Sequence, residues 1–104
     1  MGSGTYFLRD GDTLRVVGDL TWDVTNAFDQ ACRTLVAEVE GSPVVDLTEI
    51  DALGSTHLGI LAATALEAVA DGKELVIRAG PALERVLQVS ELGRMATLEY
   101  AGGP

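Results

Sequence analysis

Residues 44–59 read VVDLTEIDALGSTHLG, and this stretch decides which fold the sequence predicts. The run from Val44 to Leu47 is short and rich in β-branched residues, which is typical of a buried strand. A loop from Thr48 to Ser55 follows, and a helix is expected after it. The apolar positions of that helix recur with helical spacing at Leu58, Leu61, Ala62, Ala65 and Val69. The stretch therefore predicts a strand, a loop and a helix in succession.

The segment before this stretch predicts a β-hairpin and a first helix. Strands are expected over 6–9 and 13–17, because Asp10-Gly11-Asp12 between them is a turn signal. Asp23 and Thr25 are both candidates for the N-cap of the helix. The apolar stripe of this helix consists of Val24, Phe28, Cys32, Leu35 and Val39.

The segment after the stretch predicts a strand, a third helix and a last strand. Asp71-Gly72 closes the second helix, and the next strand is expected over 74–78. Pro81 suits the first turn of the third helix, and Gly93 is its expected stop. The last strand is expected from Met95 to Tyr100. The apolar stripe of the third helix consists of Leu83, Val86 and Leu87.

The elements are expected in the order β-β-α-β-α-β-α-β. Strands that alternate with helices predict right-handed parallel crossovers, here after an antiparallel hairpin. We expect a single α/β domain over 1–104, with 1–4 as a flexible tail or an expression remnant and 101–104 as a flexible tail. Folds of this kind place function where parallel strands lead into helices. The loop over 48–56 is therefore a candidate site.

Composition narrows the class of partner. The 104 residues include 7 Lys and Arg against 16 Asp and Glu, which gives a net charge of −9. Binding to nucleic acid or to an anionic membrane needs clustered cations, so we expect neither. The longest uncharged run lies between Asp51 and Glu67, and it is shorter than the roughly 20 residues of a membrane-spanning helix. The N-terminus lacks a signal-peptide pattern, and we expect a soluble cytoplasmic protein.

The stretch over 46–59 resembles the signature of STAS domains, specifically that of bacterial anti-sigma factor antagonists. That signature has a strand ending in Asp-Leu, a small hydroxyl residue, alternating apolar positions, and then Asp-Ser-Ser-Gly-Leu-Gly where a helix begins. The matching residues here are Asp46-Leu47-Thr48, Ile50, Leu53, Ser55, Thr56 and Leu58-Gly59.

The resemblance extends over nearly the whole chain. Gly18-Asp19-Leu20 is similar to the Gly-Glu-Leu before the family's first helix, and residues 72–75 are similar to its turn into the following strand. The run from Pro81 to Leu92 is similar to its third helix. The resemblance implies a STAS-like fold, in which a mixed sheet carries its helices mainly on one face.

The resemblance also implies a function. In that family the second serine is phosphorylated by a partner that is both a serine/threonine kinase and an anti-sigma factor. That position is Thr56 here, with Ser55 as the alternative acceptor. The unmodified protein would bind the kinase and free a sigma factor, and phosphorylation would release the kinase. ATP belongs to the partner, so no cofactor, metal or catalysis is implied for this chain. The expected partner-binding residues are Thr21, Trp22, Asp23, Gly54, Ser55, Thr56 and His57.

Three departures from the family pattern leave a second function open. Gly54 stands where the family has Asp, and His57 stands where it has Gly. The Asp usual before the first helix falls at Thr21, with Asp23 two residues later. These changes are compatible with a protein-binding or scaffold module that works without phosphorylation. The sequence also leaves open whether the chain forms a homo-oligomer.

Enzymatic interpretations find less support in the residues. Gly54 and Gly59 have the spacing of a P-loop, but Ile60 and Leu61 stand where Lys and Ser or Thr are needed. No Gly-x-Ser-x-Gly elbow surrounds Ser55. As the only histidine, His57 is a poor basis for a zinc site.

Three single residues have expected structural roles. We expect His57 to be exposed at a helix N-terminus near a partner surface. Trp22 is expected either to pack under the start of the first helix or to anchor a partner. Cys32 is expected to be a small core residue, and as the only cysteine it cannot form an internal disulfide.

Overall fold

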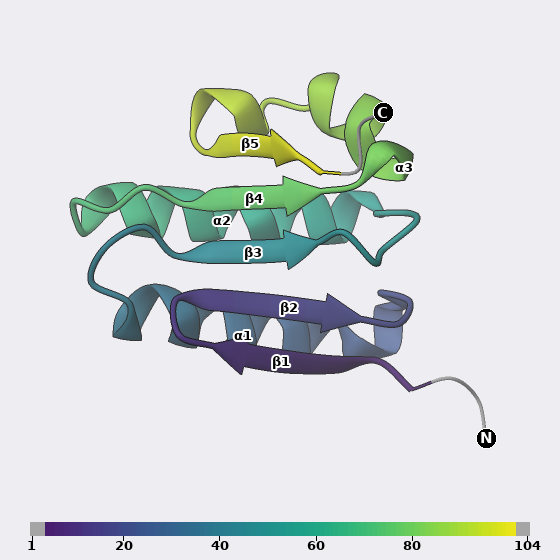
Figure 1. The fold of residues 1–104 in the computed structure, drawn as a ribbon, viewed down its shortest axis with the longest axis horizontal. Coiled ribbons are helices and arrows are strands. Elements are labelled where there is room, and N and C mark those ends of the chain that lie inside the picture. Colours follow the sequence, from purple (N-terminus) through teal and green to yellow (C-terminus); the bar gives the residue numbers. More distant parts are fainter. Residues whose placement is uncertain (1–3, 102–104) are drawn as a thin grey trace.

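The computed structural model describes residues 4–101, so the expectations for 1–3 and 102–104 concern residues outside it. The chain forms two antiparallel strands and then alternates helices with strands (Figure 1). The elements are β1 (Tyr6–Asp10), β2 (Thr13–Val17), the 3-10 turn η1 (Trp22–Val24), α1 (Thr25–Glu38), β3 (Val44–Leu47), α2 (Ser55–Ala70), β4 (Val76–Ala79), α3 (Pro81–Gln88), the 3-10 turn η2 (Leu92–Arg94) and β5 (Thr97–Tyr100).

The sheet has five strands in the spatial order β1-β2-β3-β4-β5. Strand β1 pairs antiparallel with β2, and the remaining neighbours are parallel. The carboxyl ends of β2, β3 and β4 therefore lie at one end of the sheet, where the chain enters α1, α2 and α3 (Figure 1). The predicted mixed α/β fold is confirmed.

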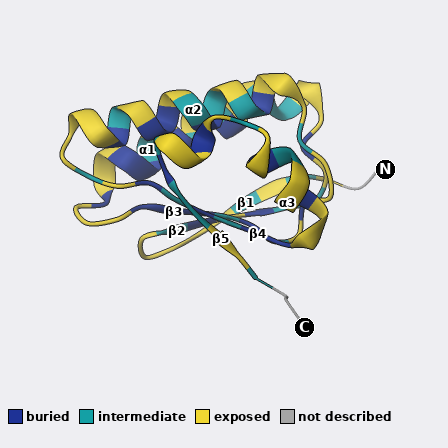
Figure 2. Ribbon diagram, turned by 90° about the horizontal axis from the view of Figure 1, so that it is seen from above, coloured by how far each residue is buried: buried dark blue, intermediate teal, exposed yellow. Residues whose placement is uncertain are grey.

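Helices α1 and α2 lie side by side on one face of the sheet, as predicted (Figure 2). The core between these helices and the sheet is apolar and closely enclosed. Its largest fully buried side chains include Phe28 and Leu35 of α1, Leu61 of α2, and Ile77 of β4. Burial of such side chains is the main source of stability for a domain of this size.

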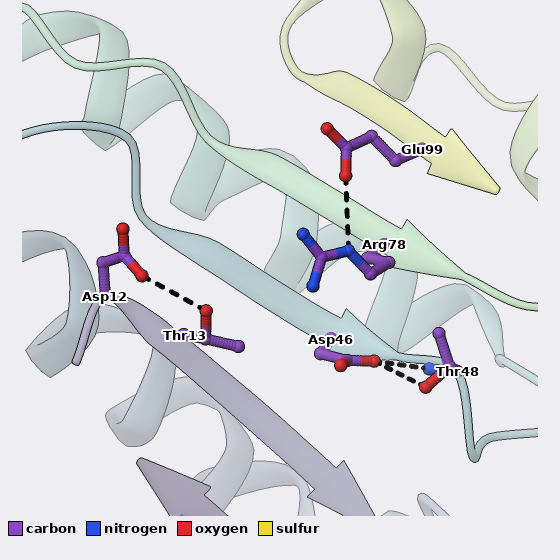
Figure 3. Close-up of polar contacts among 6 residues, drawn as sticks. All are labelled: Asp12, Thr13, Asp46, Thr48, Arg78 and Glu99. Atoms are coloured by element: carbon purple, nitrogen blue, oxygen red, sulfur yellow. Dashed lines mark hydrogen bonds and ion pairs between the residues drawn. The ribbon is translucent and has the colours of Figure 1, made fainter. Parts of the chain in front are cut away.

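The opposite face of the sheet is uncovered and carries charges in a row. Arg15, Asp46, Arg78 and Glu99 occupy equivalent register positions on β2, β3, β4 and β5. Arg78 Nε donates to Glu99 Oε1 at 3.3 Å (Figure 3). Most parallel sheets are covered on both faces. Here alternating charges on adjacent strands keep one face compatible with water.

Asp46 also fixes how the chain leaves β3. Its Oδ1 accepts hydrogen bonds from the Thr48 backbone N–H at 2.9 Å and from the Thr48 hydroxyl at 2.7 Å (Figure 3). Local bonds of this kind favour a turn over continued strand. The strand therefore ends at Leu47, and the chain is directed into the loop that leads to α2.

Several predicted boundaries are corrected. β4 covers Val76–Ala79 rather than 74–78. α3 ends at Gln88, before Gly93, and η2 follows it. The backbone N–H groups of Met95 and Ala96 donate to the carbonyl oxygen of the buried Leu92. This turn delays the last strand, which begins at Thr97 rather than Met95.

The buried stripe of α2 also differs from the prediction at its end. Val69 is 57% exposed, and Ala68 is buried in its place. The next buried residue after Ala65 is three positions along the helix rather than four. A helix with 3.6 residues per turn needs steps of both three and four residues to keep one side buried. Cys32 is buried, as predicted, and burial raises the pKa of its thiol to about 12. No helix within 4–101 is both long enough and apolar enough to cross a membrane.

Candidate functional site

The first turn of α2 and the start of α1 together form a hollow at the carboxyl end of the parallel strands. Its volume is about 430 Å³, and it is open to solvent. Thr56 lines it from α2, and the other lining residues are Trp22, Asp23, Thr25 and Asn26. The hollow thus joins the predicted acceptor to two of the residues predicted to bind a partner.

Thr56 is the second residue of α2, and its side chain is exposed. Gly54 occupies the N-cap in an extended conformation, with φ −86° and ψ 172°, and makes no side-chain capping bond. The first helical bond runs from the Leu58 N–H to the Gly54 carbonyl oxygen at 3.0 Å. Ser55, also exposed, is therefore the first helical residue rather than the cap. The free backbone N–H groups of this turn make the surroundings of Thr56 partially positive.

The start of α1 is organised differently from the prediction. Val24 takes the N-cap position without a side-chain bond, so neither Asp23 nor Thr25 caps the helix. Instead the Thr21 hydroxyl donates to Asp23 Oδ1, and the Val24 N–H donates to the Thr21 carbonyl oxygen at 3.2 Å. These bonds hold the 3-10 turn η1, and they leave Asp23 exposed at the hollow.

Trp22 does not pack under the start of α1. Its side chain is 86% exposed, although it lies in η1 directly before the helix. The indole therefore presents a large apolar area whose burial against another molecule would be favourable. Of the two roles considered, the structure excludes intramolecular packing.

His57 is buried, which corrects the expectation that it is exposed. Only 5% of the residue is accessible. Its ring packs edge-on against Phe28 of α1 with the ring centroids 6.0 Å apart, and Phe28 stacks in turn on Phe7 of β1. His57 lies one helical turn before Leu61 on the buried stripe of α2. Extending that apolar stripe back by four residues could have placed it in the core.

The predicted site residues therefore divide into three groups. Trp22, Asp23 and Thr56 meet at the hollow. Thr21, Gly54 and Ser55 are exposed beside those residues in the chain. His57 lies beneath the surface and contacts the core. Two lining residues were missed, Thr25 and Asn26, although they follow Trp22 at the three- and four-residue spacing that brings helical side chains to one face.

The hollow offers an indole, a carboxylate, an amide and hydroxyl groups. Among residues 4–101 no cluster of His, Cys, Asp and Glu could hold a metal ion. Neither ring nitrogen of His57 has a hydrogen-bond partner among these residues, so neither Ser55 nor Thr56 is paired with it as nucleophile and base. These groups are suited to recognition of another molecule.

Comparison with known proteins agrees with the fold. The crystal structure of an anti-sigma factor antagonist from Mycobacterium paratuberculosis superimposes with a TM-score of 0.75 and 27% sequence identity, covering 92% of this chain and 84% of that one. No curated protein matches the sequence. The family model described as "Mlab, STAS domain" matches residues 4–99. This chain therefore belongs to the STAS domain family.

Proposed function

We propose that this STAS domain is an anti-sigma factor antagonist whose binding to an anti-sigma kinase is controlled by phosphorylation of Thr56. The proposal depends on one observation: the Thr56 side chain is exposed at a hollow between two helix starts. The similar structure from Mycobacterium paratuberculosis is itself an anti-sigma factor antagonist. The partner would bind ATP, the domain would need no cofactor, and both would act in the cytoplasm.

Phosphorylation at Thr56 is compatible with the fold. An attached phosphate would lie near the free N–H groups of the first turn of α2, which favour anions. It would add a charge of about −1.5 to −2 to an exposed surface. The residues that line the hollow include no Lys, Arg or His, and Asp23 lies among them. The phosphate would therefore meet a carboxylate rather than a cation, and a partner fitted to the unmodified hollow would be displaced.

Trp22 is expected to anchor the partner. Exposed aromatic residues that become buried at the centre of an interface often dominate its affinity. Replacing Trp22 with alanine should weaken partner binding by about tenfold or more. The free energy of unfolding should change by no more than about 0.5 kcal/mol, because the side chain is 86% exposed.

Isothermal titration calorimetry and urea denaturation measure these two quantities. Val89→Ala is a matched control, since Val89 is 77% exposed at the end of α3. It should leave both unchanged. Unchanged affinity in Trp22→Ala would remove Trp22 from the interface.

The phosphorylation step is tested by incubating the domain with a candidate anti-sigma kinase and ATP, followed by mass spectrometry. A single phosphate on Thr56 is expected. Thr56→Ala should remain unmodified, whereas Thr56→Ser should still be phosphorylated, because a hydroxyl is retained. A phosphate that persists in Thr56→Ala and maps to Ser55 would assign the switch to the other hydroxyl.

The second candidate function is a STAS module that binds its partner without phosphorylation. Gly54 favours it, because α2 lacks the side-chain cap that an Asp at this position would supply. Tight partner binding together with no phosphorylation in the same assay would select this alternative.

A further inference from the structure

The uncovered face of the sheet carries two neighbouring rows of side chains across β2, β3, β4 and β5 (Figure 3). The first row has charges that alternate in sign, and it consists of Arg15, Asp46, Arg78 and Glu99. The second row lies two residues earlier on each strand, and it consists of Thr13, Val44, Val76 and Thr97. Residues between the rows point to the covered face, where Leu14, Val45 and Ile77 are buried.

Both rows are complementary to themselves under one symmetry operation. A twofold axis that lies on this face between β3 and β4, parallel to the strands, exchanges β2 with β5 and β3 with β4. In the first row, Arg15 then faces Glu99 of a second copy, and Arg78 faces its Asp46. In the second row, threonine faces threonine and valine faces valine. An axis along the charged row would instead place each charge opposite its own copy.

The two arginines of this face have donors to spare for such pairs. Arg15 is paired with Glu49, and Arg78 Nε donates to Glu99 Oε1 at 3.3 Å. Their side chains are still 48% and 40% exposed. A guanidinium has five N–H donors in a planar fork, so one arginine can bind a second carboxylate without releasing the first. Charges that become buried between two copies would therefore be paired, as their burial requires.

We propose that the uncovered face of the sheet binds a second copy of this chain, about the twofold axis between β3 and β4. Parallel sheets are normally covered on both faces. Within residues 4–101, α1 and α2 lie on the other face (Figure 2), and the second copy would cover this one. The hollow at Thr56 lies at the starts of those two helices and stays open in the dimer. The dimer therefore does not depend on the proposed function.

The dimer is expected to be weak and reversible. The four strands of each copy that face each other span about 19 Å by 16 Å, from the usual spacing of strands and rise per residue. An interface of this size is at the small end for specific complexes. Each copy also carries a net charge of −9, so repulsion opposes association. We therefore expect a dissociation constant between about 10 μM and 1 mM.

Sedimentation equilibrium measures this association directly. The experiment is made at about 0.15 M salt, where repulsion between exposed charges is screened beyond about 8 Å. The mean mass of the parent domain should rise from that of one chain toward that of two between about 10 μM and 1 mM. A parent domain that keeps the mass of one chain at about 1 mM would overturn the proposal. The face would then be left to solvent or to a different protein.

Charge reversal tests how the two copies are arranged. In the dimer, Arg15→Glu places two carboxylates opposite each other, and Glu99→Arg places two guanidinium groups opposite each other. Each variant alone should therefore dimerise at least about tenfold more weakly than the parent. An equimolar mixture of the two variants should recover the affinity of the parent, because every such contact in the mixed dimer joins a carboxylate to a guanidinium.

The recovery in the mixture cannot arise within one chain. Residues 15 and 99 lie on β2 and β5, about 14 Å apart with β3 and β4 between them. Each chain of the mixture also carries only one of the two substitutions. A mixture that associates no better than either variant alone would overturn the proposal.

Arg94→Glu is the matched control, because it changes the net charge by the same amount as Arg15→Glu. The Arg94 side chain is 83% exposed on η2, which contacts α2 and α3. The control should dimerise within about twofold of the parent, since its charge is exposed and screened. A loss as large as that of Arg15→Glu would show that net charge rather than this face controls association, which contradicts the proposal.

Nuclear magnetic resonance gives a second readout in the parent dimer. In a mixture of labelled and unlabelled chains, the Thr13 methyl group should give a nuclear Overhauser contact to the Thr97 methyl group of the other copy. Within one chain these residues lie on β2 and β5, too far apart for such a contact. If the parent dimerises without this contact, the interface lies elsewhere and the proposal is wrong.

Discussion

Replacing Phe28 with alanine is expected to lower the free energy of unfolding by about 3–5 kcal/mol. The Phe28 ring is fully buried and contacts two aromatic rings, Phe7 of β1 and His57 of α2. Its removal would leave a cavity at the junction of the sheet with both large helices. Because small domains are stabilised by only about 5–15 kcal/mol, this loss is a substantial fraction of the total. Urea denaturation followed by circular dichroism measures the change.

Two further variants test whether the expected loss of stability comes from the cavity left by the Phe28 ring. Phe28→Leu should lose less stability than Phe28→Ala, because it fills most of the cavity. Leu66→Ala is a surface control, since Leu66 is 58% exposed on α2. It should change the free energy of unfolding by about 0.5 kcal/mol or less. A Phe28→Ala variant as stable as Leu66→Ala would show that the α1–α2 junction does not depend on this ring.

The sequence predicted the fold well because two local patterns agree with the tertiary structure. The run over 44–47 specifies a strand in which three of four residues are buried, and the helical spacing that begins at Leu58 specifies a helix with one buried side. The glycine of the Asp71-Gly72 pair adopts φ +74°, as the end of a helix often requires. Element boundaries were less predictable where a tertiary contact decides them. The burial of Leu92, which shapes η2 and shortens β5, is such a case.

The site was only partly predictable, for two physical reasons. Polarity suggested that His57 is exposed, but its position on the α2 stripe places it against Phe28, so packing outweighed polarity there. The exposure of Trp22 depends on the η1 turn, which is held by the hydrogen bond between Thr21 and Asp23. A turn of this kind leaves no periodic pattern of apolar residues in the sequence, so it could not be predicted. In contrast, Thr56 lies where the family signature placed it, at an exposed helix start.

The differences between expectation and structure at His57 and Trp22 together change the description of the site. His57, which was expected on the surface, is buried against Phe28, and Trp22, which could have packed under the helix, is exposed. The hollow at Thr56 is therefore lined by Trp22 and Asp23, whereas His57 is not among its lining residues. Variants of Phe28 should lower stability, whereas Trp22→Ala should alter binding alone.

Thr56→Glu is expected to weaken binding of the proposed kinase partner by about a hundredfold, a loss near 3 kcal/mol. The added carboxylate imitates part of a phosphate and enters the hollow that contains Asp23. A charge buried at an interface without a counter-ion can supply a loss of this size. Thr56→Ala removes only the hydroxyl and should bind within about fivefold of the parent domain, because no charge must then be desolvated.

The stability of the Thr56→Glu variant should rise while its affinity for the partner falls. This difference in direction distinguishes weakened binding from a damaged fold. A carboxylate in the first turn of a helix is favoured by about 0.3–1 kcal/mol. Residue 56 is exposed, so Thr56→Glu should unfold at a slightly higher urea concentration than the parent. If the variant is instead destabilised, its weaker binding would have a structural cause and would not represent the switch.

The double variant Thr56→Glu with Asp23→Asn identifies the source of the repulsion. If the new carboxylate acts through Asp23, the second substitution should restore part of the affinity, with a coupling free energy of about 0.5–3 kcal/mol. Equal affinity of Thr56→Glu and Thr56→Ala for the partner would contradict control through charge at this position, and the domain would then act as a binding module without a phosphate switch.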